Sequence, residues 1–277
     1  MKKYGKKTRG DVVCQVCLIA LGLIMASPIL YALSLSLMRP QSILSQPPKL
    51  VTADFYVENY KIALESTMLA RYSVNSFIIA TVSSLFRVLF ASMAAFAFAF
   101  FEFPLKKLLF GMTLATMMIP PDVLVVTNYI TVSKMGLLNT YAGMCIVFLV
   151  AAVNIFLFRQ QFMSFSKELK EASHIDGCSN LWFFIKILIP TNKPVIVTVF
   201  ISSFISVWNQ YLWPMVITSE DAMRTVQVGV GMLKFPEGTA YGPLMAGAVI
   251  ALLPTVVLFV LFQKKIVGGM MNGSVKG

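Results

Sequence analysis

The sequence predicts an all-α, polytopic membrane protein with six transmembrane helices. Of its 277 residues, 57% are hydrophobic and only 13% are charged, and a water-soluble domain of this length could not enclose so much apolar surface. Six apolar runs each reach the roughly 18 residues that a helix needs to approach the thickness of a lipid hydrocarbon core. They cover residues 12–38, 73–101, 108–131, 141–158, 195–217 and 241–262.

The distribution of basic residues predicts the orientation of these spans. Of the 23 Lys and Arg residues, fifteen fall on one side of the six-span arrangement and seven on the other, while Arg87 lies inside a span. By the positive-inside rule the richer side is cytoplasmic. It holds an N-terminal arm (residues 1–11), the loop 160–193 and a C-terminal tail (residues 267–277), so residues 12–266 form one multi-pass domain. The net charge of +11 then reflects topology, and its counterpart is the anionic surface of the lipid bilayer rather than nucleic acid.

Prolines interrupt two of the predicted spans. Pro120 and Pro121 lie within the third, whereas Pro194 and Pro214 lie at the ends of the fifth. Broken helices are tolerated in a membrane where protein or a water-filled cavity satisfies the freed carbonyls. The prolines therefore indicate either a transport path or kinks that serve packing alone.

Residue types that carry catalysis are scarce. His174 is the one histidine, so neither a multi-histidine metal site nor a Ser-His-Asp triad is expected. The phosphate-binding pattern G-x-x-x-x-G-K-[ST] does not occur. Cys14 and Cys17 lie at the start of an apolar helix without a second pair, which favours a structural role. We expect no enzyme activity, no bound cofactor and no metal in this chain, so energy for transport would come from another protein.

The loop between the fourth and fifth spans has the pattern of two short helices. Ser166 is a suitable N-cap, and the residues after it favour a helix. Gly177 can adopt the left-handed conformation that ends a helix. A second amphipathic helix follows and is expected to stop at Pro190 and Pro194. Such a surface could dock onto a partner.

This loop resembles the cytoplasmic loop of membrane subunits in binding-protein-dependent ABC importers. The family pattern is EAA, three residues, Gly, nine residues, Ile, one residue and Leu-Pro. The chain has the full spacing, and only Ser173 and Ile189 depart from the pattern. The resemblance implies a coupling helix that inserts into a groove of a cytoplasmic ATPase. The implied coupling residues are Glu171, Ala172, Ser173, Asp176, Gly177, Ile187 and Pro190.

The resemblance extends over most of the chain and is strongest to the carbohydrate-uptake branch, in particular its second, maltose-type permease. Residues 208–214, WNQYLWP, look most like permeases for glycerol-3-phosphate, because many sugar permeases have Glu in place of Gln210. The other similar stretches are residues 75–77 (NSF), 94–104 (AAFAFAFFEFP), 136–143 (GLLNTYAG), 156–169 (FLFRQQFMSFSKEL) and 273–277 (GSVKG).

The family assignment implies partners and a place in the cell. We expect a homologous second permease, an ABC ATPase dimer that binds ATP and Mg²⁺, and an extracytoplasmic substrate-binding protein, in a bacterial-type plasma membrane. The imported ligand would be a carbohydrate or glycerol-3-phosphate. The alternative is an autonomous ion-coupled secondary transporter or channel, but such proteins usually place acids within their spans, and here Asp122 is nearly alone.

Polar residues inside the spans are candidates for the substrate path. Arg87 would cost about 3 kcal/mol if it faced lipid, so it is expected to face a cavity or a partner helix. The amides could bind sugar hydroxyls, although hydrogen bonds between helices explain them equally well. An aromatic side chain could stack on a sugar or belong to an interfacial belt. The candidates are Arg87, Asn128, Asn154, Trp208, Asn209 and Gln210.

Overall fold

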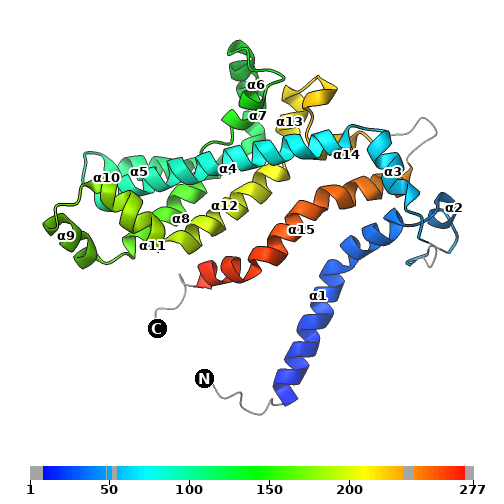
Figure 1. The fold of residues 1–277 in the computed structure, drawn as a ribbon, viewed down its shortest axis with the longest axis horizontal. Helices are drawn as coiled ribbons and strands as arrows, with labels where there is room; N and C mark the ends of the chain where they lie inside the picture. The colour runs from blue at the N-terminus through cyan, green and yellow to red at the C-terminus, as the bar shows by residue number, and fades with distance from the viewer. Residues whose placement is uncertain (1–8, 48, 52–54, 234–239, 272–277) are drawn as a thin grey trace. The chain divides into compact units, whose positions relative to one another are not determined.

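The computed structural model describes residues 9–47, 49–51, 55–233 and 240–271, and every regular element within these ranges is helical (Figure 1). The predicted all-α class is therefore confirmed. The predicted N-terminal arm and C-terminal tail lie largely outside the described residues. The first helix begins at Arg9 and the last ends at Met271.

Three helices are long and apolar enough to cross a membrane. These are α1 (Arg9–Ser36), α4 (Leu69–Phe100) and α15 (Tyr241–Met271), and they correspond to the first, second and sixth predicted spans. The most apolar window of α1 is 0% buried. An apolar helix without cover from its own chain requires lipid or a partner around it.

Two pairs of helices pass the same test together, but each is sharply bent. In the first pair, α5 (Lys106–Ala115) and η1 (Thr116–Met118) meet η2 (Pro121–Leu124) and α6 (Val125–Lys134) at 92°. In the second pair, α10 (Asn180–Phe183), η3 (Phe184–Leu188) and α11 (Ile189–Thr191) meet α12 (Lys193–Trp208) at 79°. The predicted interruption at Pro120 and Pro121 is confirmed. A proline lacks the N–H that would continue the helical ladder.

The predicted fourth and fifth spans are built differently from continuous helices. Residues 141–158 form α7 (Tyr141–Ile146) and the start of α8 (Ala152–Met163), separated by residues 147–151. The fifth span breaks after α12, and three residues separate it from α13 (Leu212–Ile217). Within the described chain, the candidate spans therefore number three, or up to five if each bent pair is one span, against the six expected.

The remaining elements are short. They are α2 (Pro40–Ile43), α3 (Glu58–Glu65), α9 (Lys167–Ile175), η4 (Asp221–Met223) and α14 (Val226–Gly231). The described residues form two compact units, one within residues 9–69 and 230–252, the other within residues 70–229 and 253–271. In the first unit, the buried Asn59 of α3 donates to the carbonyls of Ser36 and Met38, at 3.0 and 2.8 Å. These bonds satisfy carbonyls at the end of α1.

The core of the second unit is an aromatic cluster between α4, α8, α10, η3 and α12. Phe96 lies at its centre, with ring centroids 5.0 Å from Phe184 and 6.3 Å from Phe183. Phe158 and Phe162 of α8 are fully buried and stack on each other at 5.7 Å. Each aromatic side chain buries a large apolar area, and tilted or stacked pairs add to that stabilisation. The cluster thereby holds the loop 160–193 against α4.

A tight turn joins α7 to the segment before it. Gly143 of α7 lies so close to the Leu137 carbonyl oxygen that an added Cβ would be 2.1 Å away. Thr140 caps α7 by accepting a hydrogen bond from the Gly143 N–H, and the Trp213 indole donates to the Gly143 carbonyl at 3.3 Å. The position therefore excludes any side chain.

We expect Gly143→Ala to destabilise the protein by about 1–3 kcal/mol, because the backbone of Leu137 would have to move. Thermal unfolding of the purified protein in detergent measures the effect. Gly111→Ala is the matched control, since Gly111 is also helical and has nothing within 4 Å of its Cβ position. Alanine there should be neutral or stabilising. Equal stability of the two variants would contradict the steric argument.

Candidate functional site

Three helix breaks in the second unit meet around one cavity of about 440 Å³. The wall includes residues between 116 and 125 from the first break, residues 147, 148 and 150–153 at the break between α7 and α8, and Gln210 from the break after α12. This size lies within the range typical of small-molecule sites. Irregular backbone is tolerated at membrane depth where it lines such a cavity.

Arg87 reaches into this region from α4. Its Nε donates a hydrogen bond to the Phe148 carbonyl at 2.5 Å, and its guanidinium carbon lies 5.7 Å from the centroid of the Phe148 ring. Phe148 belongs to the break between α7 and α8, where the regular ladder of backbone hydrogen bonds is interrupted. The half-buried arginine thus satisfies irregular backbone and also lines the cavity.

Other polar side chains line the same cavity. Asn128 of α6 and Gln210, both half-buried, were expected on the substrate path and lie in its wall together with Arg87. Asp122 and Ser206 also line it and are absent from the predicted set. The position of Asp122, directly after Pro121 at a helix break, was the signal available in the sequence. The cavity therefore combines one cation, one carboxylate and several neutral hydrogen-bonding groups.

The other three predicted path residues lie outside this cavity. Asn154 is buried and donates to the Ser203 hydroxyl at 2.9 Å, which links α8 to α12. Trp208 is buried and stacks on Phe204, with ring centroids 5.9 Å apart. Asn209 is exposed and accepts a hydrogen bond from Gln227 at 3.2 Å. Contacts between helices account for the first two positions.

The loop 160–193 forms the expected pair of helices. Ser166 accepts a hydrogen bond from the Leu169 N–H and caps α9, as expected. At the other end Gly177 has a φ of +78°, its N–H donates to the His174 carbonyl, and the Cys178 N–H donates to the Ser173 carbonyl. This is the Schellman arrangement, and it depends on a residue that tolerates positive φ. Ser179 then caps α10.

The predicted coupling residues divide into two groups. Glu171, Ala172, Asp176 and Gly177 are exposed around the end of α9. Ser173 is buried, and its hydroxyl donates to the Lys170 carbonyl at 2.7 Å. Ile187 packs against the aromatic cluster. The motif therefore contains outward-facing residues, which could contact a partner, and inward-facing residues, which hold the loop in place.

Pro190 does not end the second helix as the sequence predicted. It is exposed and lies within α11, which continues to Thr191. The turn before it, η3, is a π-helix. A π-helical turn shifts the hydrogen-bond register by one residue, so the missing N–H of Pro190 is accommodated and the chain bends only at Asn192.

Exposed apolar side chains surround the outward-facing motif residues. Ile175 is 87% exposed, Leu181 67% and Trp182 48%. They are not part of the family pattern and were therefore not among the predicted coupling residues, although their position near Gly177 is visible in the sequence. Behind this surface, the Lys170 ammonium donates to the Phe100 carbonyl at 3.2 Å, which joins α9 to the end of α4.

Comparison with known proteins identifies the family. The model for "Binding-protein-dependent transport system inner membrane component" matches residues 87–271. The sn-glycerol-3-phosphate transport system permease protein of Brucella abortus is 33% identical over 259 residues, which cover 90% of this chain and 92% of the relative. The arabinooligosaccharides transport system permease protein of Halalkalibacterium halodurans is 33% identical over 257 residues, which cover 93% and 90%.

A solved structure shares the fold. A chain from the crystal structure of a bacterial ABC transporter involved in the import of the acidic polysaccharide alginate superposes with a TM-score of 0.78 at 23% identity, covering 94% of this chain and 99% of the other. The loop 160–193, the broken helices and these matches lead to one conclusion. This chain belongs to the inner membrane components of binding-protein-dependent transport systems, the permease subunits of ABC importers.

Proposed function

We propose that this permease moves a carbohydrate or glycerol-3-phosphate across the plasma membrane by ATP-driven alternating access. The exposed helix-turn-helix of α9 and α10 carries the proposal, because it presents the family's coupling residues to a partner. The names of the relatives supply the ligand class, since they transport sn-glycerol-3-phosphate or arabinooligosaccharides. The autonomous ion-coupled transporter is not supported by these similarities.

The proposed assembly contains a homologous second permease, two copies of an ATPase and an extracytoplasmic substrate-binding protein. The ATPases would bind ATP and Mg²⁺, because this chain lacks a phosphate-binding loop. Both termini and the loop 160–193 would face the cytoplasm, in keeping with the excess of Lys and Arg on that side. The opposite side would meet the binding protein.

Closure of the ATPases would act on the exposed end of α9. Glu171, Asp176 and the surrounding apolar side chains provide polar and apolar contacts for a groove. Lys170 connects α9 to α4, and the aromatic cluster connects the following helix, α10, to α4. Arg87 lies on α4 at the cavity. A closed ATPase dimer that binds one permease conformation more tightly than the other shifts the equilibrium between inward-open and outward-open states.

The cavity around Arg87 is the proposed substrate path. Arg87 would attract a phosphate ester, while Asn128 and Gln210 would hydrogen-bond hydroxyl groups. The remaining candidates, Asn154, Trp208 and Asn209, would act by holding the surrounding helices in place, consistent with their contacts to Ser203, Phe204 and Gln227.

We expect Gly177→Val to abolish transport-coupled stimulation of ATP hydrolysis. A β-branched residue resists the positive φ at this turn, so the exposed end of α9 would be reshaped. ATP hydrolysis of the reconstituted importer measures the effect. Gly136→Val is the matched control, because Gly136 also has a positive φ (+69°) and an unobstructed Cβ position but lies far along the chain from the coupling motif. Normal stimulation in Gly177→Val would count strongly against the coupling role.

We expect Arg87→Gln to reduce uptake of glycerol-3-phosphate by roughly tenfold or more while complex assembly is unchanged, because a charge-assisted hydrogen bond to an anion is lost. Uptake into proteoliposomes and the yield of purified complex measure the two quantities. Arg87→Lys keeps the charge and should retain more uptake than Arg87→Gln. Loss of assembly in Arg87→Gln would instead assign the residue to packing.

A further inference from the structure

A second set of polar contacts lies at the other end of α4. Residues 217–229, here called the seated segment, run along the N-terminal part of α4. Asn75, buried on α4, donates from its Nδ2 to the carbonyls of Ala222 and Arg224, at 2.9 and 2.8 Å. Its Oδ1 accepts a hydrogen bond from the Tyr141 hydroxyl of α7 at 2.6 Å. One amide thus joins three parts of the chain.

Neighbouring residues of α4 make further contacts with the seated segment. The Ser76 hydroxyl accepts a hydrogen bond from the Val226 N–H at 2.8 Å. One turn away, Gly229 packs so closely on the buried Tyr72 ring that an added Cβ would lie 2.2 Å from it. From the exposed side, the Arg71 Nε donates to the Ala222 carbonyl at 2.9 Å. The seated segment therefore follows α4 over more than one helical turn.

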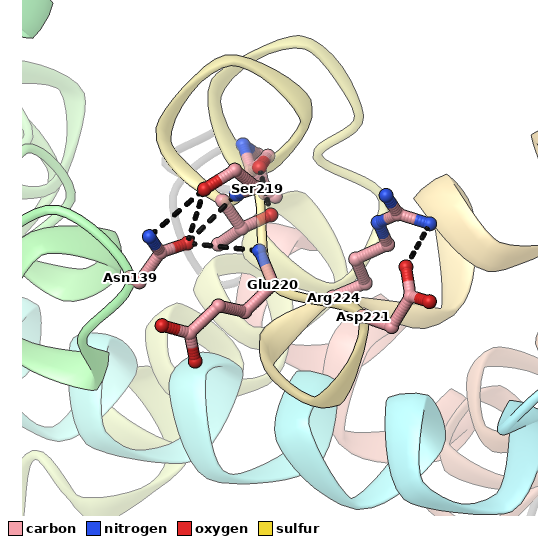
Figure 2. A network of polar contacts seen from close by, with 7 residues as sticks. Asn139, Ser219, Glu220, Asp221 and Arg224 are labelled. Carbon is pink, nitrogen blue, oxygen red and sulfur yellow. Dashed lines mark hydrogen bonds and ion pairs between the residues drawn. The ribbon is translucent and has the colours of Figure 1, made fainter.

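A second amide fixes the start of the seated segment, as Figure 2 shows. Asn139 precedes α7 and has a φ of +55°. Its Oδ1 accepts hydrogen bonds from the backbone N–H groups of Ser219 and Glu220, at 2.7 and 3.1 Å. The backbone N–H of Asn139 donates to the Ile217 carbonyl. Asp221 and Arg224 form an ion pair within the segment at 2.6 Å.

The backbone of the seated segment is thus held by asparagines, whereas Ser219, Glu220 and Asp221 are exposed. We infer that Asn75 is a positioning residue that makes the seated segment, α4 and α7 move as one body, so that a protein docking on the segment acts directly on both helices. This inference rests on the proposed function, in which the substrate-binding protein docks on this side.

The same helix, α4, also contacts the loop 160–193, which contains the predicted coupling residues. Phe100, which accepts the hydrogen bond from Lys170, lies 25 residues after Asn75 on α4. At about 1.5 Å per residue the two contacts are about 38 Å apart along one continuous helix. Docking of the binding protein would therefore act on α4 at Asn75, and α4 leads from there to the ATPase side.

The test uses the complete importer in lipid vesicles with its cognate binding protein, in parallel arms loaded with sn-glycerol-3-phosphate and with arabinooligosaccharides. Asn75→Leu keeps a similar volume but removes all three hydrogen bonds. We expect stimulation of ATP hydrolysis by the loaded binding protein to fall roughly fivefold or more, because two carbonyls and a phenol lose their buried partner. Hydrolysis without the binding protein should remain at the parent level.

Two variants make the result specific. Arg71→Gln removes another bond to the same Ala222 carbonyl from the exposed side and should keep stimulation within about twofold, because Asn75 still donates to that carbonyl. Tyr141→Phe removes a single bond and should lower stimulation with assembly intact. In the double variant with Asn75→Leu it should add no further loss, since both changes break one network.

Three outcomes would overturn the inference. They are parent-level stimulation in Asn75→Leu, an equal fall of basal and stimulated hydrolysis in that variant, and unchanged stimulation in Tyr141→Phe. If Asn75→Leu fails to assemble, Tyr141→Phe decides the question. A parent complex that shows no stimulation in either arm would instead contradict the proposed function.

Discussion

The second unit depends on one constraint, namely that backbone groups buried in a membrane protein must find partners inside it. A continuous helix meets this constraint by itself, but three helices of this unit are broken. Their freed groups are satisfied from neighbouring elements, as in the hydrogen bond from Arg87 to the Phe148 carbonyl. Because the breaks converge, they enclose a cavity with polar backbone and polar side chains in its wall. The breaks that interrupt regular helical hydrogen bonds are therefore the same breaks that place polar groups in the cavity wall.

The unbroken helix α4 connects the parts that this constraint produces. Near its N-terminus it binds the seated segment through Asn75, near its middle it places Arg87 at the cavity, and at its C-terminus the Phe100 carbonyl accepts the hydrogen bond from Lys170. All three contacts use backbone carbonyls as acceptors, so they fix main-chain positions rather than flexible side-chain tips. The 32 residues of α4 include no proline, so a common cause of a sharp kink is absent from this helix.

Local signals in the sequence predicted the features that depend on local chemistry. Ser166, Gly177 and Pro121 act through the conformation of their own backbone, and each lies at the cap, turn or break expected of it. The break between α7 and α8 contains no proline or glycine, so composition predicted a continuous span. The Phe148 carbonyl in this break finds its partner in Arg87 of α4, a tertiary contact that local sequence does not show. For the same reason the sequence could select Asn128 and Asn154 as polar residues within spans but could not distinguish the one that lines the cavity from the one bonded to Ser203.

In the loop 160–193, one motif contains both residues that are exposed and residues that hold the loop in place. The spacing of the motif separates residues with different roles. Ile187 packs against the aromatic cluster, whereas the positive φ of Gly177 makes the turn at the exposed end of α9. In the proposed function the ATPases displace this surface, so it needs a rigid support; otherwise the loop would deform instead of moving the helices. The closely packed phenylalanines behind α10 supply that support. Ile175, Leu181 and Trp182 take no part in that cluster, so they remain exposed around Gly177.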